Sequence, residues 1–203
     1  MQLRRSDVVT GALTLLDTEG LDGLTMRKLG AHLGVQAGGI YWHFANKQAL
    51  LAAMADRIIA PVATEPLPDA PWDAQLTELG QRLRHALLKH RDGARVVAGT
   101  YVIEPNTIRA GEQALRILIT AGFPADRAAW VMAPVFYYVL GHTIEEQAQH
   151  AEGDWTERNS DEADPALQTA MTSMLSAAPS DRFTFGLNLF LDGLRHRLPH
   201  SPA

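Results

Sequence analysis

The sequence predicts an all-α protein with an N-terminal helix-turn-helix head and a larger helical domain behind it. Three observations support this prediction. Apolar residues recur at helical spacing in most segments, glycines and prolines separate those segments, and residues 24–51 hold two short helical patterns, a tight turn and a third pattern. The chain has 203 residues, 46% of them hydrophobic, so it can bury a core in one large or two small domains.

The first two helices of the head are predicted from their end signals. Ser6 is a good N-cap for the first, Asp7 places negative charge where the helix dipole favours it, and Gly20 ends the helix. Thr25 is the N-cap of the second, and Gly34 follows it where a turn needs a residue that tolerates positive φ. The apolar stripe of this second helix consists of Leu29, Ala31 and Leu33.

The segment at residues 36–44 is unusual for a helix because it begins with small residues and ends in exposed-looking aromatic and polar groups. Two adjacent glycines each cost a helix about 1 kcal/mol, so close approach to another surface is one candidate explanation. The major groove of DNA admits a helix whose leading side chains are small or polar. The predicted DNA-binding residues are Arg27, Lys28, Gln36, Ala37, Gly38, Gly39, Tyr41, Trp42, His43 and Lys47. Asn46 is expected to cap a connecting helix that runs to about residue 58.

The larger domain is predicted to begin after a run of prolines. Four prolines at residues 61–71 indicate a rigid, polar linker rather than a core element, which divides the chain into domains at residues 1–60 and 61–203. Helices are expected at residues 72–90, 94–100, 107–121, 125–149, 165–176 and 181–198. The helix at 125–149 is apolar on nearly every side, so it needs several partners, such as a ligand chamber and a second subunit. Residues 145–164 hold eight acids against one arginine and are expected to be mostly a solvated loop.

The charge of the chain is unevenly distributed. The net charge is −5, but residues 1–60 hold six basic against five acidic groups, so the head is the less acidic part. The sequence contains no cysteine, which excludes a disulfide framework and fits a reducing cytoplasm. It shows neither a signal peptide nor an apolar run near the roughly 20 residues of a membrane span. A cytoplasmic location is expected.

Residues 24–51 resemble the head of the tetracycline-repressor (TetR) family of bacterial transcriptional regulators. The resemblance rests on Arg-Lys-Leu, Leu-Gly-Val, Tyr-Trp-His and Asn-Lys-x-x-Leu-Leu in this order. Residues 86–96 and the pair Leu140 and Gly141 look like the ligand domain of the tetracycline-responsive branch. The resemblance implies a homodimeric repressor that binds a palindromic operator and releases it when a small ligand enters the second domain. It also implies that the long apolar helix and the last helix pair with their symmetry mates as a four-helix bundle.

The effector is expected to differ from that of the drug-binding relatives. By the resemblance, those proteins hold a magnesium–tetracycline chelate through a histidine just after the Arg-Asp-Gly-Ala segment, where this chain has Val97. A hard cation prefers oxygen ligands or a well-placed imidazole, so neither this chelate nor a cofactor is expected. The predicted ligand-binding residues of a mostly apolar pocket are Leu83, Leu87, Val97, Tyr101, Ile117, Trp130, Phe136 and Tyr137. For any one of them, core packing is the alternative.

Two other functions compete with the regulator. His142, Glu145 and Glu146 have the spacing of one helix face, which a metal-dependent enzyme or a metal sensor could use. The usual sequence motifs of hydrolases and of phosphate-binding loops are missing, so an enzyme is not expected. A helical module that only dimerises is the third possibility.

Overall fold

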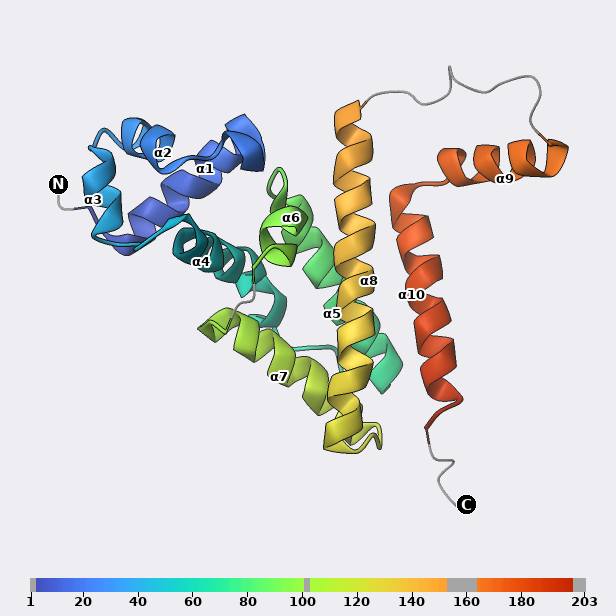
Figure 1. Cartoon of the computed structure of the whole chain (residues 1–203). Coiled ribbons are helices and arrows are strands. Elements are labelled where there is room, and N and C mark those ends of the chain that lie inside the picture. The colour runs from blue at the N-terminus through green and yellow to red at the C-terminus, as the bar shows by residue number, and fades with distance from the viewer. Residues whose placement is uncertain (1–2, 101–102, 153–163, 199–203) are drawn as a thin grey trace.

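The structure is a computed structural model that describes residues 3–100, 103–152 and 164–198, and these residues form helices and contain no β-strand. Their helices are α1 (Arg5–Gly23), α2 (Met26–His32), α3 (Ala37–Tyr41), α4 (Lys47–Ile59), the 3₁₀-helix η1 (Ala60–Ala63), α5 (Trp72–Leu88), α6 (Gly93–Ala98), α7 (Pro105–Thr120), α8 (Ala125–Glu152), α9 (Pro165–Ser176) and α10 (Pro179–Arg195). Helices α1 to α3 form a head at one end, and α4 leads from it into the larger domain (Figure 1). The predicted all-α fold is confirmed.

The helices of the head begin and end at specific caps. α1 starts earlier than predicted, with Arg4 rather than Ser6 as its N-cap, because the Asp7 carboxylate accepts the backbone N–H of Arg4 at 2.9 Å. Gly20, which was predicted to end this helix, instead kinks it, with a φ of 72° that other residues rarely adopt, and the helix continues to Gly23. The hydroxyl of Thr25 caps α2 as predicted by accepting a backbone N–H of the first turn at 3.2 Å.

The turn between α2 and α3 depends on two glycines. Gly34 has a φ of 68°, in the left-handed region that the sequence analysis predicts for it. A Cβ on Gly30 would lie 2.9 Å from the backbone oxygen of Val35, so a larger residue would push the two helices apart. Ala31 does not belong to the apolar stripe, because it is exposed two residues from the buried Leu29 and therefore lies on nearly the opposite side of α2.

The segment at residues 36–44 exposes Tyr41 and Trp42 as predicted, but it buries Ile40 and its last residue, Phe44, so the prediction of an exposed end is corrected for Phe44. Ile40 is fully buried and Phe44 is 2% exposed. The guanidinium of Arg5 lies 4.6 Å from the centre of the Phe44 ring, a cation–π contact that joins the start of α1 to this segment. The side chain of Asn46 caps α4, as predicted, by accepting a backbone N–H at 2.8 Å.

The connection between α4 and α5 contributes to the core, in contrast to the predicted polar linker. Val62 in η1 is 2% exposed. Pro61 occupies the first turn of η1, where a missing N–H costs nothing, so the chain continues helically from α4 for one more turn. The linker prediction therefore fits only the residues after η1.

The long helix α8 runs to Glu152, three residues beyond its predicted end, so the first eight residues of the strip predicted to be mostly loop are helical. Side-chain contacts hold this end of α8. The carboxylate of Glu146 pairs with Arg84 of α5, and the side-chain amide of Gln147 donates to the backbone oxygens of Leu87 at 3.2 Å and His90 at 2.8 Å. Residues 153–163 of the predicted loop lie outside the described residues.

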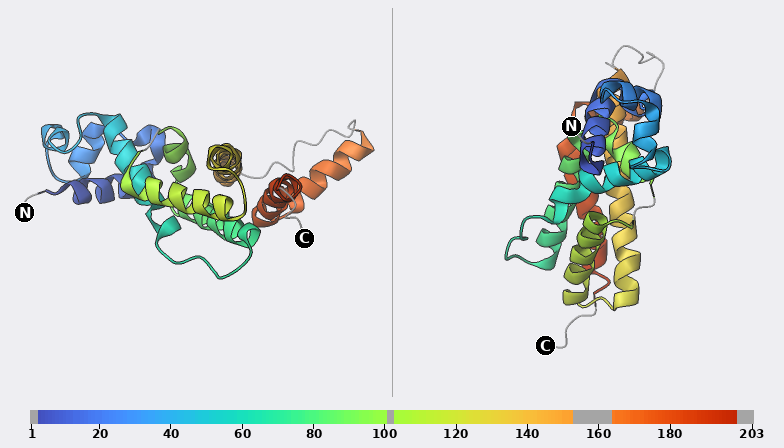
Figure 2. Two further views of the ribbon diagram at one scale, coloured as in Figure 1. Left: turned by 90° about the horizontal axis from the view of Figure 1, so that it is seen from below. Right: turned by 90° about the vertical axis from the view of Figure 1, so that its left-hand side faces the viewer.

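Helices α9 and α10 lie at the end of the molecule opposite the head (Figure 2). α10 packs along α8, and the hydroxyl of Tyr138 donates to the backbone oxygen of Phe183 at 2.9 Å. α9 projects from the body and buries none of its residues. The exposed large apolar side chains of α9 and α10 are Leu167, Met171, Met174, Leu175, Phe185, Leu189 and Phe190. So much apolar surface at one end indicates that a partner covers it.

Candidate DNA-reading surface and effector pocket

All ten residues predicted to bind DNA lie at the surface of the head. Tyr41 is 51% and Trp42 is 90% exposed, so neither aromatic side chain packs in the core. The other exposed members are Arg27, Lys28, Gln36 and Gly38, and the partly buried ones are Ala37, Gly39, His43 and Lys47. Arg27 and Lys28 lie in the first turn of α2, Lys47 begins α4, and the other seven residues lie at residues 36–43, in α3 and next to its ends.

The glycines of α3 are not required by packing within the chain. A Cβ on Gly38 would meet no atom within 4 Å, and one on Gly39 would make only ordinary contacts at 3.7 Å with Val35. Neither glycine has a positive φ. Because α3 gains nothing internally from these helix-weakening residues, close approach of an external surface is the remaining physical reason for them.

Two of the lysines predicted to contact DNA, Lys28 and Lys47, already have hydrogen-bond partners within the head. The Nζ atom of Lys28 lies 2.6 Å from Oε2 of Glu19, and this hydrogen bond holds the pKa of that carboxyl below its usual range. The Nζ atom of Lys47 donates to the backbone oxygen of Leu21 at 3.5 Å. The ion pair is exposed on both sides and is therefore weak, so a phosphate can replace Glu19 as the partner of Lys28.

The head and the larger domain are joined by polar contacts that the sequence analysis did not identify. The turn before α6 holds Asp92 in the left-handed region with a φ of 57°, and its Oδ2 accepts the backbone N–H of Leu21 at 2.8 Å. Asp17 accepts the backbone N–H of Arg91 at 3.0 Å and contacts Nδ1 of His90 at 3.0 Å. These contacts hold the end of α1 against the turn, although the residues are more than 70 positions apart.

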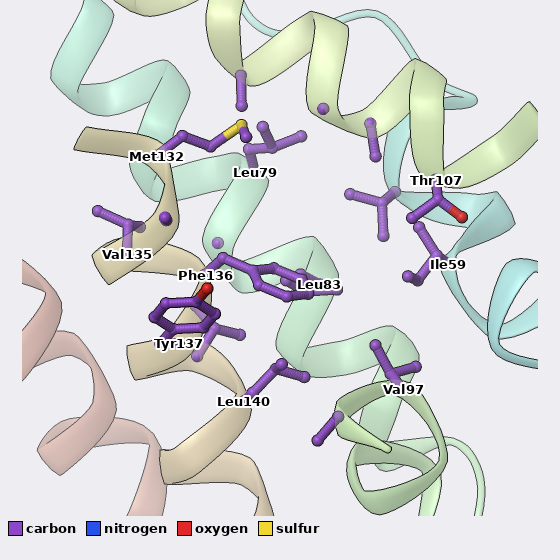
Figure 3. Close-up of a pocket in the computed structure, with 18 of the residues that line it drawn as sticks. Ile59, Leu79, Leu83, Val97, Thr107, Met132, Val135, Phe136, Tyr137 and Leu140 are labelled. Atoms are coloured by element: carbon purple, nitrogen blue, oxygen red, sulfur yellow. The ribbon is translucent and has the colours of Figure 1, made fainter. Parts of the chain in front are cut away.

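A cavity of about 680 Å³ lies between α4, η1 and α5 to α8 (Figure 3). The described residues that line it are Ile59, Val62, Leu76, Leu79, Gly80, Leu83, Val97, Ala98, Thr100, Ile103, Thr107, Ala110, Gly111, Ala114, Met132, Ala133, Val135, Phe136, Tyr137, Val139 and Leu140. None of these lining residues is an aspartate, glutamate, lysine, arginine or histidine. The polar side chains among them are two threonines, Thr100 and Thr107, and one tyrosine, Tyr137. A largely apolar chamber of this size suits a drug-sized molecule.

Only part of the predicted pocket lies in this cavity. Leu83, Val97, Phe136 and Tyr137 line it, and Tyr101 lies outside the described residues. The prediction is wrong for Leu87, Ile117 and Trp130, which do not line it.

The three residues outside the cavity have other surroundings. Leu87 and Ile117 are core residues, 0% and 5% exposed, one turn beyond the lining residues of their helices. Trp130 is 70% exposed and stacks with Arg127, whose guanidinium carbon lies 4.6 Å from the ring centre. It precedes the lining residue Met132 by two positions, which places it on nearly the opposite side of α8.

The described residues give the metal-site alternative no support. Nδ1 of His142 lies 3.8 Å from Oε2 of Glu146, but that carboxylate is occupied by Arg84, and the neighbouring Glu145 is exposed. Burial lowers the pKa of His142, and its Nδ1 has no hydrogen-bond partner among the described residues. No group of three or more histidine, aspartate or glutamate side chains within this part of the chain is arranged to hold a metal ion.

A surface-exposed reading helix on a helical head, joined by α4 to an apolar chamber, defines a ligand-responsive DNA-binding transcriptional regulator. Residues 8–54 match the family of bacterial regulatory proteins named tetR, and residues 65–198 match the tetracyclin repressor-like C-terminal domain. The chain belongs to the TetR family of transcriptional repressors.

The comparisons extend over nearly the whole chain. The tetracycline repressor protein class A from transposon 1721 of Escherichia coli is 38% identical over 97% of this chain and 92% of its own length. A possible TetR family regulator from Streptomyces coelicolor A3(2) superposes with a TM-score of 0.88 at 40% identity, covering 95% of this chain and 99% of that one. BioQ, solved with its double-stranded DNA operator, superposes with a TM-score of 0.73 at 35% identity, covering 95% of this chain and 98% of BioQ.

The solved relatives are found with DNA and with small molecules. BioQ was solved with its double-stranded DNA operator, the Streptomyces coelicolor TetR family protein ActR was solved with (S)-DNPA, and regulators of this family act as dimers. The relatives are transcription regulators rather than enzymes. None of the described helices is long and apolar enough to cross a membrane.

Proposed function

We propose that the protein is a cytoplasmic, non-enzymatic repressor that an uncharged, largely apolar small molecule releases from a palindromic operator. One observation carries this proposal. Ile59 at the end of α4 and Val62 in η1 line the cavity, and α4 is the helix that leads out of the head. A molecule in the cavity would therefore touch the same helix that positions the DNA-reading surface.

The residues proposed to contact DNA are the ten surface residues of the head named in the sequence analysis. They are Arg27, Lys28, Gln36, Ala37, Gly38, Gly39, Tyr41, Trp42, His43 and Lys47. Their exposure and the absence of an internal need for the glycines of α3 support this assignment. Two heads bind successive major grooves when they lie about 34 Å apart or a multiple of it. The effector binds better to a dimer with a different head separation, and so shifts the population away from the operator-bound form.

The effector is proposed to be neutral and metal-independent. A charged ligand would lose its hydration without gaining an opposite charge, because the described lining has no ionised side chain at neutral pH. Val97 offers no ligand for magnesium, although the E. coli relative is named as a tetracycline repressor. Leu83, Val97, Phe136 and Tyr137 remain the proposed ligand-binding residues from the sequence analysis.

The proposed domain boundary stays between residues 60 and 61. The matched regions, residues 8–54 and 65–198, fall on either side of it and support a division in this part of the chain. Because α4 and η1 pack on α5, α6 and α7, this boundary separates two functions rather than two independent cores.

The operator-binding proposal is tested with DNA from immediately upstream of the protein's own gene. We expect a dimer in sedimentation analysis and binding in a fluorescence anisotropy titration. Arg27, Lys28 and Lys47 from each of two subunits give six cations, so the logarithm of affinity should fall with the logarithm of salt concentration at a slope of about −5. A monomer that ignores this DNA at low salt would contradict the proposal and favour a helical module without DNA.

The effector proposal is tested with two probes. We expect calorimetry to detect no magnesium-dependent binding of tetracycline, whereas Nile red, which is uncharged and largely apolar, should bind with increased fluorescence. Gly111 lines the cavity and has open space where a Cβ would lie, so Gly111→Trp should weaken Nile red binding at least about 10-fold by occupying the chamber.

The matched control for this variant is His85→Trp, because His85 is exposed on α5 and does not line the cavity. It should leave Nile red affinity unchanged. Tight, magnesium-dependent tetracycline binding would overturn the proposed effector class. Equal Nile red affinity of Gly111→Trp and the unmodified chain would show that the probe binds elsewhere.

A further inference from the structure

The first turn of α7 is capped by a carboxylate from α4. Oδ1 of Asp56 accepts the backbone N–H groups of Asn106 at 2.9 Å and Thr107 at 3.0 Å, and also the hydroxyl of Thr107 at 3.0 Å. Oδ2 of the same carboxylate accepts the side-chain amide of Asn106 at 2.6 Å. One aspartate thus receives four hydrogen bonds from two residues that lie 50 and 51 positions further along the chain.

α7 has no cap of its own. Glu104 stands at the N-cap position but makes no side-chain cap hydrogen bond, and Pro105 follows it without a backbone N–H. The next two N–H groups need an acceptor, and a carboxylate there also meets the positive end of the helix dipole. Because Asp56 supplies it, the start of α7 is held to the helix that carries the head.

Thr107 belongs both to the lining of the cavity and to the contact between α4 and α7. It lines the effector pocket, where Figure 3 shows it beside Ile59, and its hydroxyl donates to Asp56. Ile59 follows Asp56 by one turn on α4 and lines the same end of the cavity. Ile59 and Thr107 are thus an apolar and a polar lining group beside each other, and the polar one belongs to the α4–α7 contact.

We infer that Asp56 is a positioning residue that transmits occupancy of the pocket to the head, and that the effector carries a hydrogen-bond acceptor, such as a carbonyl oxygen, at the end next to Thr107. This inference rests on the proposed function. The hydroxyl of Thr107 has one hydrogen to donate, so an acceptor in the cavity competes with Asp56 for it. When the effector takes this hydrogen, the carboxylate loses one of its four donors, and the hold of α7 on α4 weakens.

The inference is tested through the separation of the two heads in the dimer. The chain has no cysteine, and Thr14 is exposed on α1, so Thr14→Cys carries a single spin label per subunit for a distance measurement between heads. In Asp56→Ala without any ligand, we expect a broadened distance distribution and operator affinity about 10-fold weaker, within the range usual for allosteric coupling. Asp56→Asn keeps an oxygen for the backbone N–H groups and should restore most of both properties.

The matched control is Asp164→Ala. Asp164 caps α9 by accepting the backbone N–H of Ala166 at 2.7 Å, so this variant loses a helix cap of the same kind without touching α4. It should keep the head distances of the unmodified chain even if its melting temperature falls as far as that of Asp56→Ala. Identical distance distributions in Asp56→Ala, Asp164→Ala and the unmodified chain would overturn the inference.

Nile red, which has a carbonyl oxygen, tests the role of the Thr107 hydroxyl. Thr107→Val keeps the shape of the side chain and the backbone caps but removes the donor, whereas Thr107→Ser keeps it. We expect Nile red to shift the head distances in the unmodified chain and in Thr107→Ser, but not in Thr107→Val. An equal shift in all three would refute the role of the hydroxyl. If Nile red does not bind the unmodified chain, this result counts against the proposed apolar effector. The comparison of the Asp56 variants without ligand would still decide whether Asp56 is a positioning residue.

Discussion

We expect Gly38→Glu to bind operator DNA at least about 100-fold more weakly than the unmodified protein, which corresponds to about 2.7 kcal/mol. A carboxylate at the exposed start of α3 would face the phosphates and base edges of the groove, and like charges brought together at an interface cost several kcal/mol. The fold should not suffer, because a Cβ at this position meets no atom within 4 Å. Fluorescence anisotropy measures the affinity, and the thermal melting temperature checks the fold.

Two control variants show whether the loss of affinity comes from the added negative charge and from its position on α3. Gly38→Ala should bind operator within about 10-fold of the unmodified chain, because a methyl group is small enough for the groove and improves helix propensity. His85→Glu adds a carboxylate at an exposed position of α5, far along the chain from α3, and should leave affinity nearly unchanged. Operator binding by Gly38→Glu at the unmodified strength would mean that α3 does not face the DNA.

The second large effect is expected at the buried ion pair between α5 and α8. The Arg84 guanidinium donates to Glu146 through Nε at 2.8 Å and through a second nitrogen at 2.5 Å, and the two side chains are 10% and 6% exposed. The guanidinium also lies 5.3 Å from the ring centre of Phe183 in α10. Arg84→Ala should lower the free energy of unfolding by about 3–5 kcal/mol, because a buried carboxylate loses its principal charge partner.

The double variant Arg84→Met with Glu146→Leu removes both charges and should recover most of that loss, since a buried ion pair is often no more stable than well-packed apolar residues. Arg127→Ala is the control, because its pair with Asp126 is exposed on both sides and should contribute less than about 1 kcal/mol. Denaturant unfolding monitored by circular dichroism measures all three. A loss below about 1 kcal/mol in Arg84→Ala would show that the pair does not anchor α8.

Much of the head could be predicted from the sequence, because most of its signals are local. Thr25 and Asn46 cap the helices that they immediately precede, and Gly34 adopts the positive φ that its place after α2 predicts. The exposure of Tyr41 and Trp42 also agrees with the prediction. The error at Phe44 arose because its neighbour in space, Arg5, lies far away along the chain.

The larger domain was predicted less well, because helical periodicity fixes a residue's face on its own helix but not which helix covers that face. Val97 and Leu83 line the cavity, whereas Leu87, one turn beyond Leu83, is packed in the core. Trp130 is a large aromatic residue like those that line pockets, but it lies on the outer side of α8. The sequence alone could not separate these cases, since cavity, core and outer surface are all apolar here.

By itself the sequence determined the helices, the position of the reading head and the apolar character of the second domain. Only the tertiary structure decided which residues share the cavity, and which distant polar groups meet, such as Asp56 with the first turn of α7 and Arg84 with Glu146. The physical reason is the distance along the chain over which each kind of interaction acts. Caps, turns and amphipathic faces depend on neighbours within about one or two helical turns, whereas pockets and buried pairs depend on the packing of helices that the chain brings together from far apart.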